Sequence, residues 1–206
     1  MKNFTLEIRE LFNDKGMVKI YERERPIFYK DDESDKVYLI ESGIVKIVNY
    51  SEEGKELILA IFQEGDIFGE MSAFDKRGRS ACAIPVKTSR IYELPGRHFI
   101  DFLKQKPELL LHIVKILSLR IRELNDFIED TVFSNLSSRI LNRLIKLSKV
   151  SGIQKGNYFE IRNDFTQGDL AGFIGCTREN LNKELKILKE KGFIDYDKHS
   201  IRVIIR

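Results

Sequence analysis

The chain has few residues of the types that build redox, metal and catalytic centres. Its 206 residues include two cysteines, Cys82 and Cys176, which lie far apart and without CxxC spacing. We therefore expect neither a disulfide framework nor a zinc site, and a reducing cytoplasm fits. Three histidines and no nucleophile–base set offer little for general acid–base chemistry, so we do not expect an enzyme.

Long hydrophobic runs are also missing. No apolar run approaches the roughly 18 residues that a membrane span needs, and the first residues, which alternate charged and apolar side chains, do not resemble a signal peptide. Hydrophobic residues make up 42% and charged residues 33%, which is ordinary for a globular protein. The sequence predicts a cytoplasmic protein of one large or two small domains with no membrane partner.

Positive charge is concentrated at one end of the chain. Residues 137–206 hold 14 Lys and Arg against 8 Asp and Glu, whereas residues 1–136 hold 21 against 24. The net charge of +3 says little by itself, but this distribution places the basic excess where binding to phosphates would need it.

Residues 17–100 have a β pattern. Apolar runs at 37–40, 44–48 and 57–62 are separated by the polar, Gly-bearing segments 41–43 and 51–55. Short strands at regular spacing predict a sandwich or barrel. A short helical segment, Phe99 to Leu103, follows and ends near Pro107.

A long helix is predicted from Pro107 to about Thr131, where there is no glycine or further proline. Leucines recur every seven residues, and a β-branched residue follows each of them by four. Parallel two-stranded coiled coils favour this arrangement, so we predict a dimer interface. The alternative is one amphipathic helix packed on its own β domain through Ile113 and Ile116. The predicted interface residues are Leu110, Val114, Leu117, Ile121, Leu124 and Ile128.

The segment Phe133–Ser138 is predicted to be a hinge, after which Ser137 or Ser138 caps a helix from Arg139 to Lys149. Residues 152–156 are expected to be a loop and residues 159–161 a strand. A closing hairpin, with strands at 192–194 and 201–204 around the turn 195–200, would form a wing.

Between that strand and the wing, residues 166–183 have the pattern of a helix-turn-helix. Thr166 and Asp169 have capping-box spacing, Gly175 ends the first helix, and Thr177 begins the second. Arg178 and Glu179 follow on the first turn, where a recognition helix places the side chains that reach base edges.

A second motif lies in the β segment. Gly65 and Gly69 bracket a polar segment, Glu70 follows, and Arg79 and Ser80 come about ten residues later. Backbone amides, a guanidinium, a hydroxyl and a carboxylate suit a sugar phosphate. Spacing alone favours the alternative, a β-turn with an internal Glu70–Arg79 ion pair.

Both motifs together make the chain similar to the Crp–Fnr family of bacterial transcription regulators. The resemblance covers almost the full length, through residues 38–43, 53–56, 65–70 and 175–179. It implies an α+β architecture: an N-terminal cyclic-nucleotide-binding-type β-roll with a dimerisation helix (1–133), and a C-terminal winged helix-turn-helix DNA-binding domain (134–206). It also implies a homodimer, an effector that shifts an existing equilibrium, and RNA polymerase as a partner.

The resemblance further implies a cyclic nucleotide, such as cAMP, as effector. Glu70 would accept the ribose 2′-hydroxyl, Arg79 and Ser80 would hold the cyclic phosphate, and amides near Gly69 and Met71 would assist. The positions that read the purine in cAMP-responsive members are Leu124, which cannot hydrogen-bond, and Asn125, which can. A different effector or constitutive activity stays open, as does a module that acts on a protein partner. Iron–sulfur members need several N-terminal cysteines, and there are none before Cys82. The possible haem ligands, His98, His112 and His199, are expected to be surface or packing residues, and no metal is expected.

For DNA, Arg178 is placed to bind guanine and Glu179 to accept from cytosine, with Lys183 on the same face. Thr166, Gln167 and Thr177 stand at helix N-termini and suit phosphate oxygens. Lys186, Lys189 and Lys191 are expected to be a solvated basic face. Glu184 is expected to be exposed or paired with Lys186 or Lys189. A parallel dimer predicts a palindromic double-stranded site.

Overall fold

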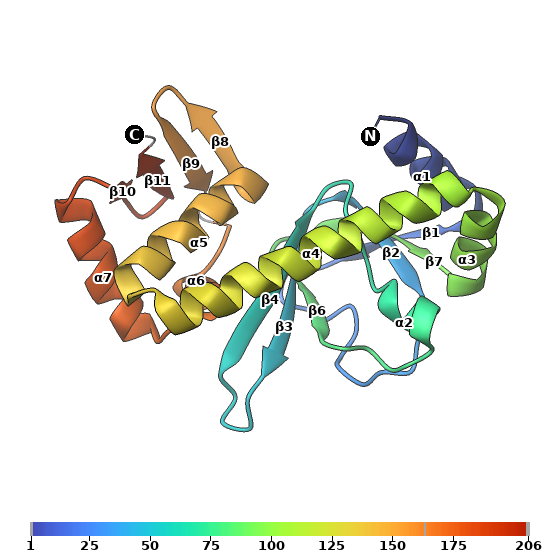
Figure 1. Ribbon diagram of the computed structural model, residues 1–206, viewed down its shortest axis with the longest axis horizontal. Helices are drawn as coiled ribbons and strands as arrows, with labels where there is room; N and C mark the ends of the chain where they lie inside the picture. Colours follow the sequence, from blue (N-terminus) through green and yellow to red (C-terminus); the bar gives the residue numbers. More distant parts are fainter. Residues whose placement is uncertain (1, 163, 205–206) are drawn as a thin grey trace. The chain divides into compact units, whose positions relative to one another are not determined.

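The computed structural model describes residues 2–162 and 164–204 and consists of two compact units. The first comprises residues 1–49 and 60–124, and the second comprises residues 50–59 and 125–206. The predicted α+β architecture, with a β-rich N-terminal part, a long helix and a C-terminal helix-turn-helix, is confirmed (Figure 1).

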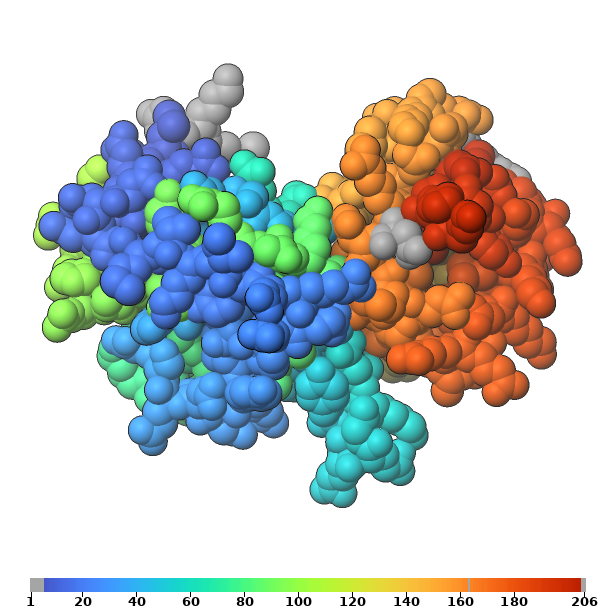
Figure 2. Space-filling view, turned by 180° about the vertical axis from the view of Figure 1, so that it is seen from behind, coloured from blue at the N-terminus to red at the C-terminus, as the bar shows by residue number. Residues whose placement is uncertain are grey.

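Antiparallel strands dominate the N-terminal part. One sheet has the order β1 (Met17–Tyr21), β7 (Ser89–Leu94), β2 (Val37–Ser42) and β5 (Ile67–Phe68). The other has the order β4 (Glu56–Gln63), β3 (Ile44–Tyr50) and β6 (Cys82–Pro85). Residues 51–55, which join β3 and β4, are exposed, and this hairpin projects from the surface (Figures 1 and 2).

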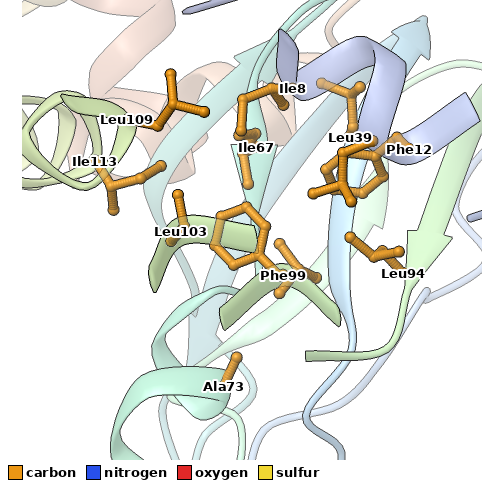
Figure 3. Close-up of a cluster of buried hydrophobic side chains, with 12 residues drawn as sticks. Ile8, Phe12, Leu39, Ile67, Ala73, Leu94, Phe99, Leu103, Leu109 and Ile113 are labelled. Atoms are coloured by element: carbon orange, nitrogen blue, oxygen red, sulfur yellow. The ribbon is translucent and has the colours of Figure 1, made fainter. Parts of the chain in front are cut away.

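Helices close one side of this β structure and complete its core. Figure 3 shows Phe12 of α1 (Lys2–Lys15), Phe99 of α3 (Gly96–Gln105) and Ile113 of α4 (Pro107–Phe133) around Leu39 and Leu94 of the sheet. Neither α1 nor the short helix α2 (Met71–Asp75) was predicted from the sequence, and α3 is longer than the predicted segment Phe99 to Leu103. Burial of these apolar faces, rather than the local propensity of short segments, stabilises such helices.

Helix α4 has two apolar faces. Leu109 and Ile113 are buried, and Ile116 packs on the same core. The alternative in which α4 packs on its own β domain is therefore correct for this face of the helix. Five of the six predicted interface residues form a second, exposed face, and Leu117 lies partly against the core. Packing on the β-roll therefore leaves most of the heptad stripe in solvent.

The second unit contains the winged helix-turn-helix and the predicted hinge, of which Ser134 and Asn135 lie between helices, whereas Phe133 ends α4 and residues 136–138 begin the next helix. It holds α5 (Leu136–Ser151), β8 (Gly152–Lys155), β9 (Tyr158–Arg162), α6 (Gln167–Ile174), α7 (Arg178–Glu190), β10 (Ile194–Tyr196) and β11 (Ser200–Ile204). Its antiparallel sheet has the order β10-β11-β9-β8. The predicted wing is β10 and β11.

Two local predictions in this unit are wrong. Residues 152–156 are not a loop, because strand β8 pairs with β9 across the two-residue turn Gly156–Asn157, and Gly156 supplies the positive φ of 57°. The cap of α5 is neither Ser137 nor Ser138. Asn135 accepts a hydrogen bond from the Ser138 amide at 2.9 Å, so the helix starts three residues earlier than predicted.

No helix among the residues that the structure describes is long and apolar enough to cross a membrane.

Candidate functional site: effector cassette and DNA-reading helices

The cassette predicted to bind the effector, residues 69–80, begins at a glycine that a larger residue could not replace without strain. Gly69 has φ 73°, and a Cβ there would lie 2.9 Å from Nη1 of Arg79 and 3.0 Å from the Tyr38 ring. Left-handed backbone and close packing both require glycine here. The chain then turns through Glu70 into α2, which places the carboxylate and the guanidinium in the same part of the fold.

Arg79 lies inside the protein, with 2% of its surface exposed. Its Nη1 donates to the Gly69 carbonyl at 2.6 Å, and Nη2 donates to the Lys36 carbonyl at 2.8 Å and to Ser34 Oγ at 3.1 Å. The guanidinium also stacks over the Phe28 ring, 4.4 Å from its centroid. Burial lowers the pKa of Arg79, which a nearby Tyr38 partly opposes. Its Nε is buried and has no hydrogen-bond partner among the described residues.

Glu70 pairs with a different arginine from the one the sequence suggested. Its carboxylate is 4% exposed and accepts from Nη1 of Arg120, on α4, at 2.7 Å. Arg120 also donates to the Ile67 carbonyl at 2.5 Å and lies over the Phe62 ring. The alternative of an internal Glu70–Arg79 ion pair is therefore not what holds this carboxylate: α4 neutralises it.

Sequence reasoning missed Arg120 and Ser34. Arg120 could have been found, because it continues the spacing of Leu109, Ile113 and Ile116 along the face of α4 that covers the β-roll. An arginine at such a position must meet a buried acceptor. Ser34 lies in an irregular segment, and no pattern in the sequence pointed to it.

The other cassette residues are accessible. Met71 and Ser80 are exposed, and Ser80 Oγ lies 3.9 Å from Met71 Sδ. Asn125 and Leu124 are exposed on α4. The residue types fit an anionic ligand: one guanidinium with an unbonded Nε, one exposed hydroxyl and a carboxylate for a hydroxyl donor.

The helix-turn-helix is capped at each junction that the sequence indicated. Thr166 Oγ1 accepts from the Asp169 amide at 3.0 Å, and the Asp169 carboxylate accepts from the Thr166 amide at 2.7 Å, which completes the capping box. Gly175 ends α6 with φ 75°. Thr177 Oγ1 accepts from the Asn180 amide at 3.2 Å and begins α7.

The predicted DNA-contacting side chains are exposed on or beside α7. Thr166, Gln167, Thr177, Arg178, Glu179 and Lys183 all face solvent. Arg178 lies against the first turn of α6, where a Cβ added to Gly168 would come within 2.5 Å of its Nη2. Glu179 and Lys183 are four residues apart and share one side of the helix. Leu181 and Leu185 bury the opposite side.

Glu184 was expected to be exposed or paired with Lys186 or Lys189, but the structure gives it a different partner. Its carboxylate accepts a short hydrogen bond from Ser137 of α5, which ties the recognition helix to the helix that follows the hinge. A carboxylate in place of an apolar residue is accommodated because α5 presents a hydroxyl.

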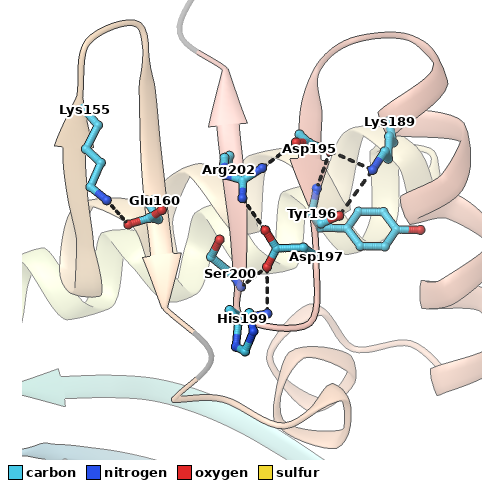
Figure 4. A network of polar contacts seen from close by, with 9 residues as sticks. All are labelled: Lys155, Glu160, Lys189, Asp195, Tyr196, Asp197, His199, Ser200 and Arg202. Carbon is cyan, nitrogen blue, oxygen red and sulfur yellow. Dashed lines mark hydrogen bonds and ion pairs between the residues drawn. The ribbon is translucent and has the colours of Figure 1, made fainter.

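Lys186, Lys189 and Lys191 are exposed, as expected for a solvated basic face, but Lys189 also has partners in the wing. Its ammonium lies 2.7 Å from Asp195 and donates to the Tyr196 carbonyl at 3.2 Å, so it joins α7 to the wing (Figure 4). On the other side of Asp195, Arg202 donates at 2.5 Å and also contacts Asp197. The hydrogen bond from Lys189 is the largest of the effects that lower the pKa of Asp195. This network fixes the wing and neutralises two cations.

The two cysteines and His112 have surroundings typical of structural residues. Cys82 is buried and its Sγ accepts from the Lys30 amide at 3.3 Å. Burial raises the pKa of the Cys176 thiol. His112 Nδ1 lies 2.9 Å from the Glu108 carbonyl of its own helix.

Comparison with known proteins matches both units of this arrangement. Residues 18–106 match a cyclic nucleotide-binding domain, and residues 138–206 match a Crp-like helix-turn-helix domain. A cyclic AMP receptor protein of Thermus thermophilus is 30% identical over 176 residues, which are 85% of this chain and 78% of that protein. The chain belongs to the Crp–Fnr family. It is therefore a transcription regulator that binds DNA through its winged helix-turn-helix and carries a cyclic nucleotide-binding-type sensor domain.

Two further relatives show how widely effectors differ. A CRP-like cAMP-activated global transcriptional regulator of Mycobacterium tuberculosis is 28% identical over 183 residues, 89% of this chain and 82% of that protein. A solved structure described as the c-di-GMP-responsive global regulator of Xanthomonas campestris shares the fold, with a TM-score of 0.82 at 22% identity over 98% of this chain and 99% of that one. Membership of the Crp–Fnr family fixes the fold and the DNA-binding output but leaves the effector open.

Proposed function

We propose that this Crp–Fnr regulator is a homodimer that binds a palindromic DNA site and acts with RNA polymerase. Residues 1–133 form the sensing and dimerising domain, and residues 134–206 form the DNA-reading domain. The observation that carries the proposal is that Arg178 and Glu179 are exposed on the first turn of α7. Gly175 ends the preceding helix α6, and Thr177 caps the start of α7. Arg178 reads guanine, Glu179 reads cytosine and Lys183 makes a single-point contact. Thr166, Gln167 and Thr177 bind phosphates.

The exposed heptad face of α4 supports the dimer. Leu110, Val114, Ile121, Leu124 and Ile128 expose apolar side chains to solvent along one side of the helix. Such a stripe is buried when two copies pair in parallel, with β-branched residues and leucines alternating as two-stranded coiled coils favour.

Oligomeric state tests this interface. Ile121→Glu introduces a charge in the middle of the stripe, whereas Leu119→Glu introduces the same charge on the opposite side of α4, at a residue of equal exposure (61% against 58%). Light scattering should show a monomer for the first variant and a dimer for the second. A dimer of unchanged stability for Ile121→Glu would contradict the proposed interface.

For the effector, we propose a cyclic nucleotide, with cAMP as the first candidate. Glu70 would accept the ribose 2′-hydroxyl, Arg79 and Ser80 would hold the phosphate beside the amides of Gly69 and Met71, and Asn125 would contact the base. Arg79 and Glu70 hold internal partners in this structure. Effector binding would therefore exchange the protein acceptors of Arg79 for phosphate oxygens. It would also exchange the Arg120 donor of Glu70 for the ribose hydroxyl, and so disturb the contact that ties the cassette to α4.

A second candidate is a regulator with a non-nucleotide effector or with constitutive DNA binding. The observation that favours it is that Glu70 is already neutralised by Arg120 while Arg79 already donates to two carbonyls and a hydroxyl. Leu124, at a position that reads the purine in cAMP-responsive members, offers no hydrogen bond.

Calorimetric titration separates the two candidates. The full-length protein is titrated with cAMP and with cGMP, and binding heat together with tighter DNA binding supports the cyclic nucleotide. Ser80→Ala should weaken the response without unfolding the protein, because Ser80 is exposed. No heat and no thermal shift with either nucleotide would overturn this part of the proposal and leave the DNA-binding part intact.

A further inference from the structure

The first turn of α6 holds a side chain of the recognition helix by an amide–amide hydrogen bond. Nδ2 of Asn182, on α7, donates to Oε1 of Gln167 at 3.2 Å. Both residues are exposed. Within the described part of the chain, this is the hydrogen bond that the Asn182 side chain makes. A surface asparagine that packing would otherwise leave free to rotate is thus held in one orientation.

Asn182 lies on the side of α7 that also carries Arg178. The two residues are four apart, which places them on one face about 6 Å apart along the axis. Asn182 also borders a cleft between the start of α6, α7 and the wing turn, and cations of Arg162 and Lys198 lie on its rim.

The hydrogen-bonding groups left on Asn182 match one base. A carboxamide has two N–H donors and one carbonyl acceptor. Because one N–H is donated to Gln167, a second N–H and the carbonyl oxygen remain. Adenine presents the complementary pair in the major groove, an N7 acceptor beside an N6 amine donor, and asparagine bound to both atoms is a favoured pairing. Arginine and glutamate, the neighbouring readers, do not recognise this edge.

We propose that Asn182 is a further base-reading residue, which selects an A·T pair in each half-site next to the base pair read by Arg178. Gln167 is its positioning residue, in addition to the phosphate contact proposed for it. Fixing the amide before DNA arrives lowers the entropy that binding costs. This inference rests on the proposed DNA-reading function.

The test uses the full-length protein and DNA fragments that are recovered with it from cells, so that its effector is present during binding. The sequence shared by the fragments recovered with the wild-type protein defines the half-site. Binding is then measured by fluorescence anisotropy on the recovered site and on all single base-pair variants. Asn182→Ala should remove the preference for adenine at one position per half-site, a loss of discrimination on the order of tenfold. Asn180→Ala, the same change on the first turn of α7 and away from Gln167, is the matched control.

Replacing the adenine by 7-deazaadenine removes the N7 acceptor alone. Wild-type affinity should fall, Asn182→Ala should be insensitive, and Asn180→Ala should respond as the wild type does. Gln167→Ala should weaken binding to every sequence through the lost phosphate contact and should also show a smaller deazaadenine effect than the wild type. An undiminished deazaadenine effect in Gln167→Ala would contradict its positioning role.

The possible outcomes separate this inference from the proposed function. Retention of every base preference by Asn182→Ala, while Arg178→Ala loses one, would overturn the role of Asn182 and leave the DNA-reading function standing. If the wild-type protein itself shows no preference for recovered over scrambled DNA, both fall. An equal deazaadenine effect in Asn182→Ala and the wild type would assign the adenine to another residue.

Discussion

Arg79 and Arg178 belong to the two working regions of this protein and have opposite surroundings. Arg79 is buried, donates to three acceptors and stacks on an aromatic ring. Arg178 is exposed on the first turn of α7 and lies beside Gly168. In the cassette the charged groups already stabilise the fold, whereas on the recognition helix they face solvent.

These different surroundings have different consequences for ligand binding at the cassette and for DNA binding at α7. A ligand of the cassette has to compete with existing partners of Arg79 and Glu70, so its binding is coupled to rearrangement of the sensor. Glu179 and Lys183 are exposed, so the proposed reading face can bind DNA without first displacing a buried partner.

The largest effect that follows from this comparison is on stability. Arg79→Ala leaves the carbonyls of Gly69 and Lys36 without their donor and opens a cavity beside Phe28, so the free energy of unfolding should fall by about 3 kcal/mol. Urea denaturation of the full-length protein measures it. Arg178→Ala, at an exposed position, should stay within about 0.5 kcal/mol of the wild type. Equal stability of the two variants would break the comparison.

A smaller effect is expected at the start of α5, in the DNA-reading unit. Asn135→Ala removes the hydrogen bond to the Ser138 amide, so thermal or chemical unfolding should show a loss of about 1 kcal/mol. Ser138→Ala keeps that amide and should cost far less. A larger loss in Ser138→Ala than in Asn135→Ala would restore the serine cap that the sequence suggested.

The smallest effect concerns the wing. Asp195→Asn weakens the exposed contacts with Lys189 and Arg202, and the loss should be under about 0.5 kcal/mol at neutral pH. The folded-state pKa of Asp195 lies below its ordinary value of 3.8. The stabilisation is thus present above that value and disappears as the pH falls through and below it. Thermal melts of both proteins should differ slightly at pH 7 and coincide at acidic pH. A difference that grows on acidification would contradict the assignment.

The helix-turn-helix could be predicted almost residue by residue, because its determinants are local. Thr166 with Asp169, Gly175 and Thr177 act through hydrogen bonds or backbone angles within three or four residues, which a linear pattern records. The hairpin of β8 and β9 was missed although its turn is also local. Its strands are short, and a turn sequence such as Gly156–Asn157 is equally common in longer loops.

The partners in the cassette could not be predicted to the same degree. Glu70 and Arg79 were recognised as belonging to one site, but Arg120 is 50 residues away from Glu70 and reaches it only because α4 packs on the β-roll. Ser34 and the carbonyls that hold Arg79 depend in the same way on tertiary contacts. Residue types gave the chemistry of the site, whereas the pairing of its charges depended on the fold.

The central claim is that the exposed face of α7 reads DNA, and it is tested most directly by comparing wild-type protein with Arg178→Ala on DNA recovered from cells. Anisotropy titrations on that DNA and on a scrambled duplex, at several salt concentrations, give the preference of each protein. We expect Arg178→Ala to bind both duplexes with the same affinity, and this remaining affinity should fall as the salt concentration rises. The same preference in the variant as in the wild type, with both proteins folded, would contradict it.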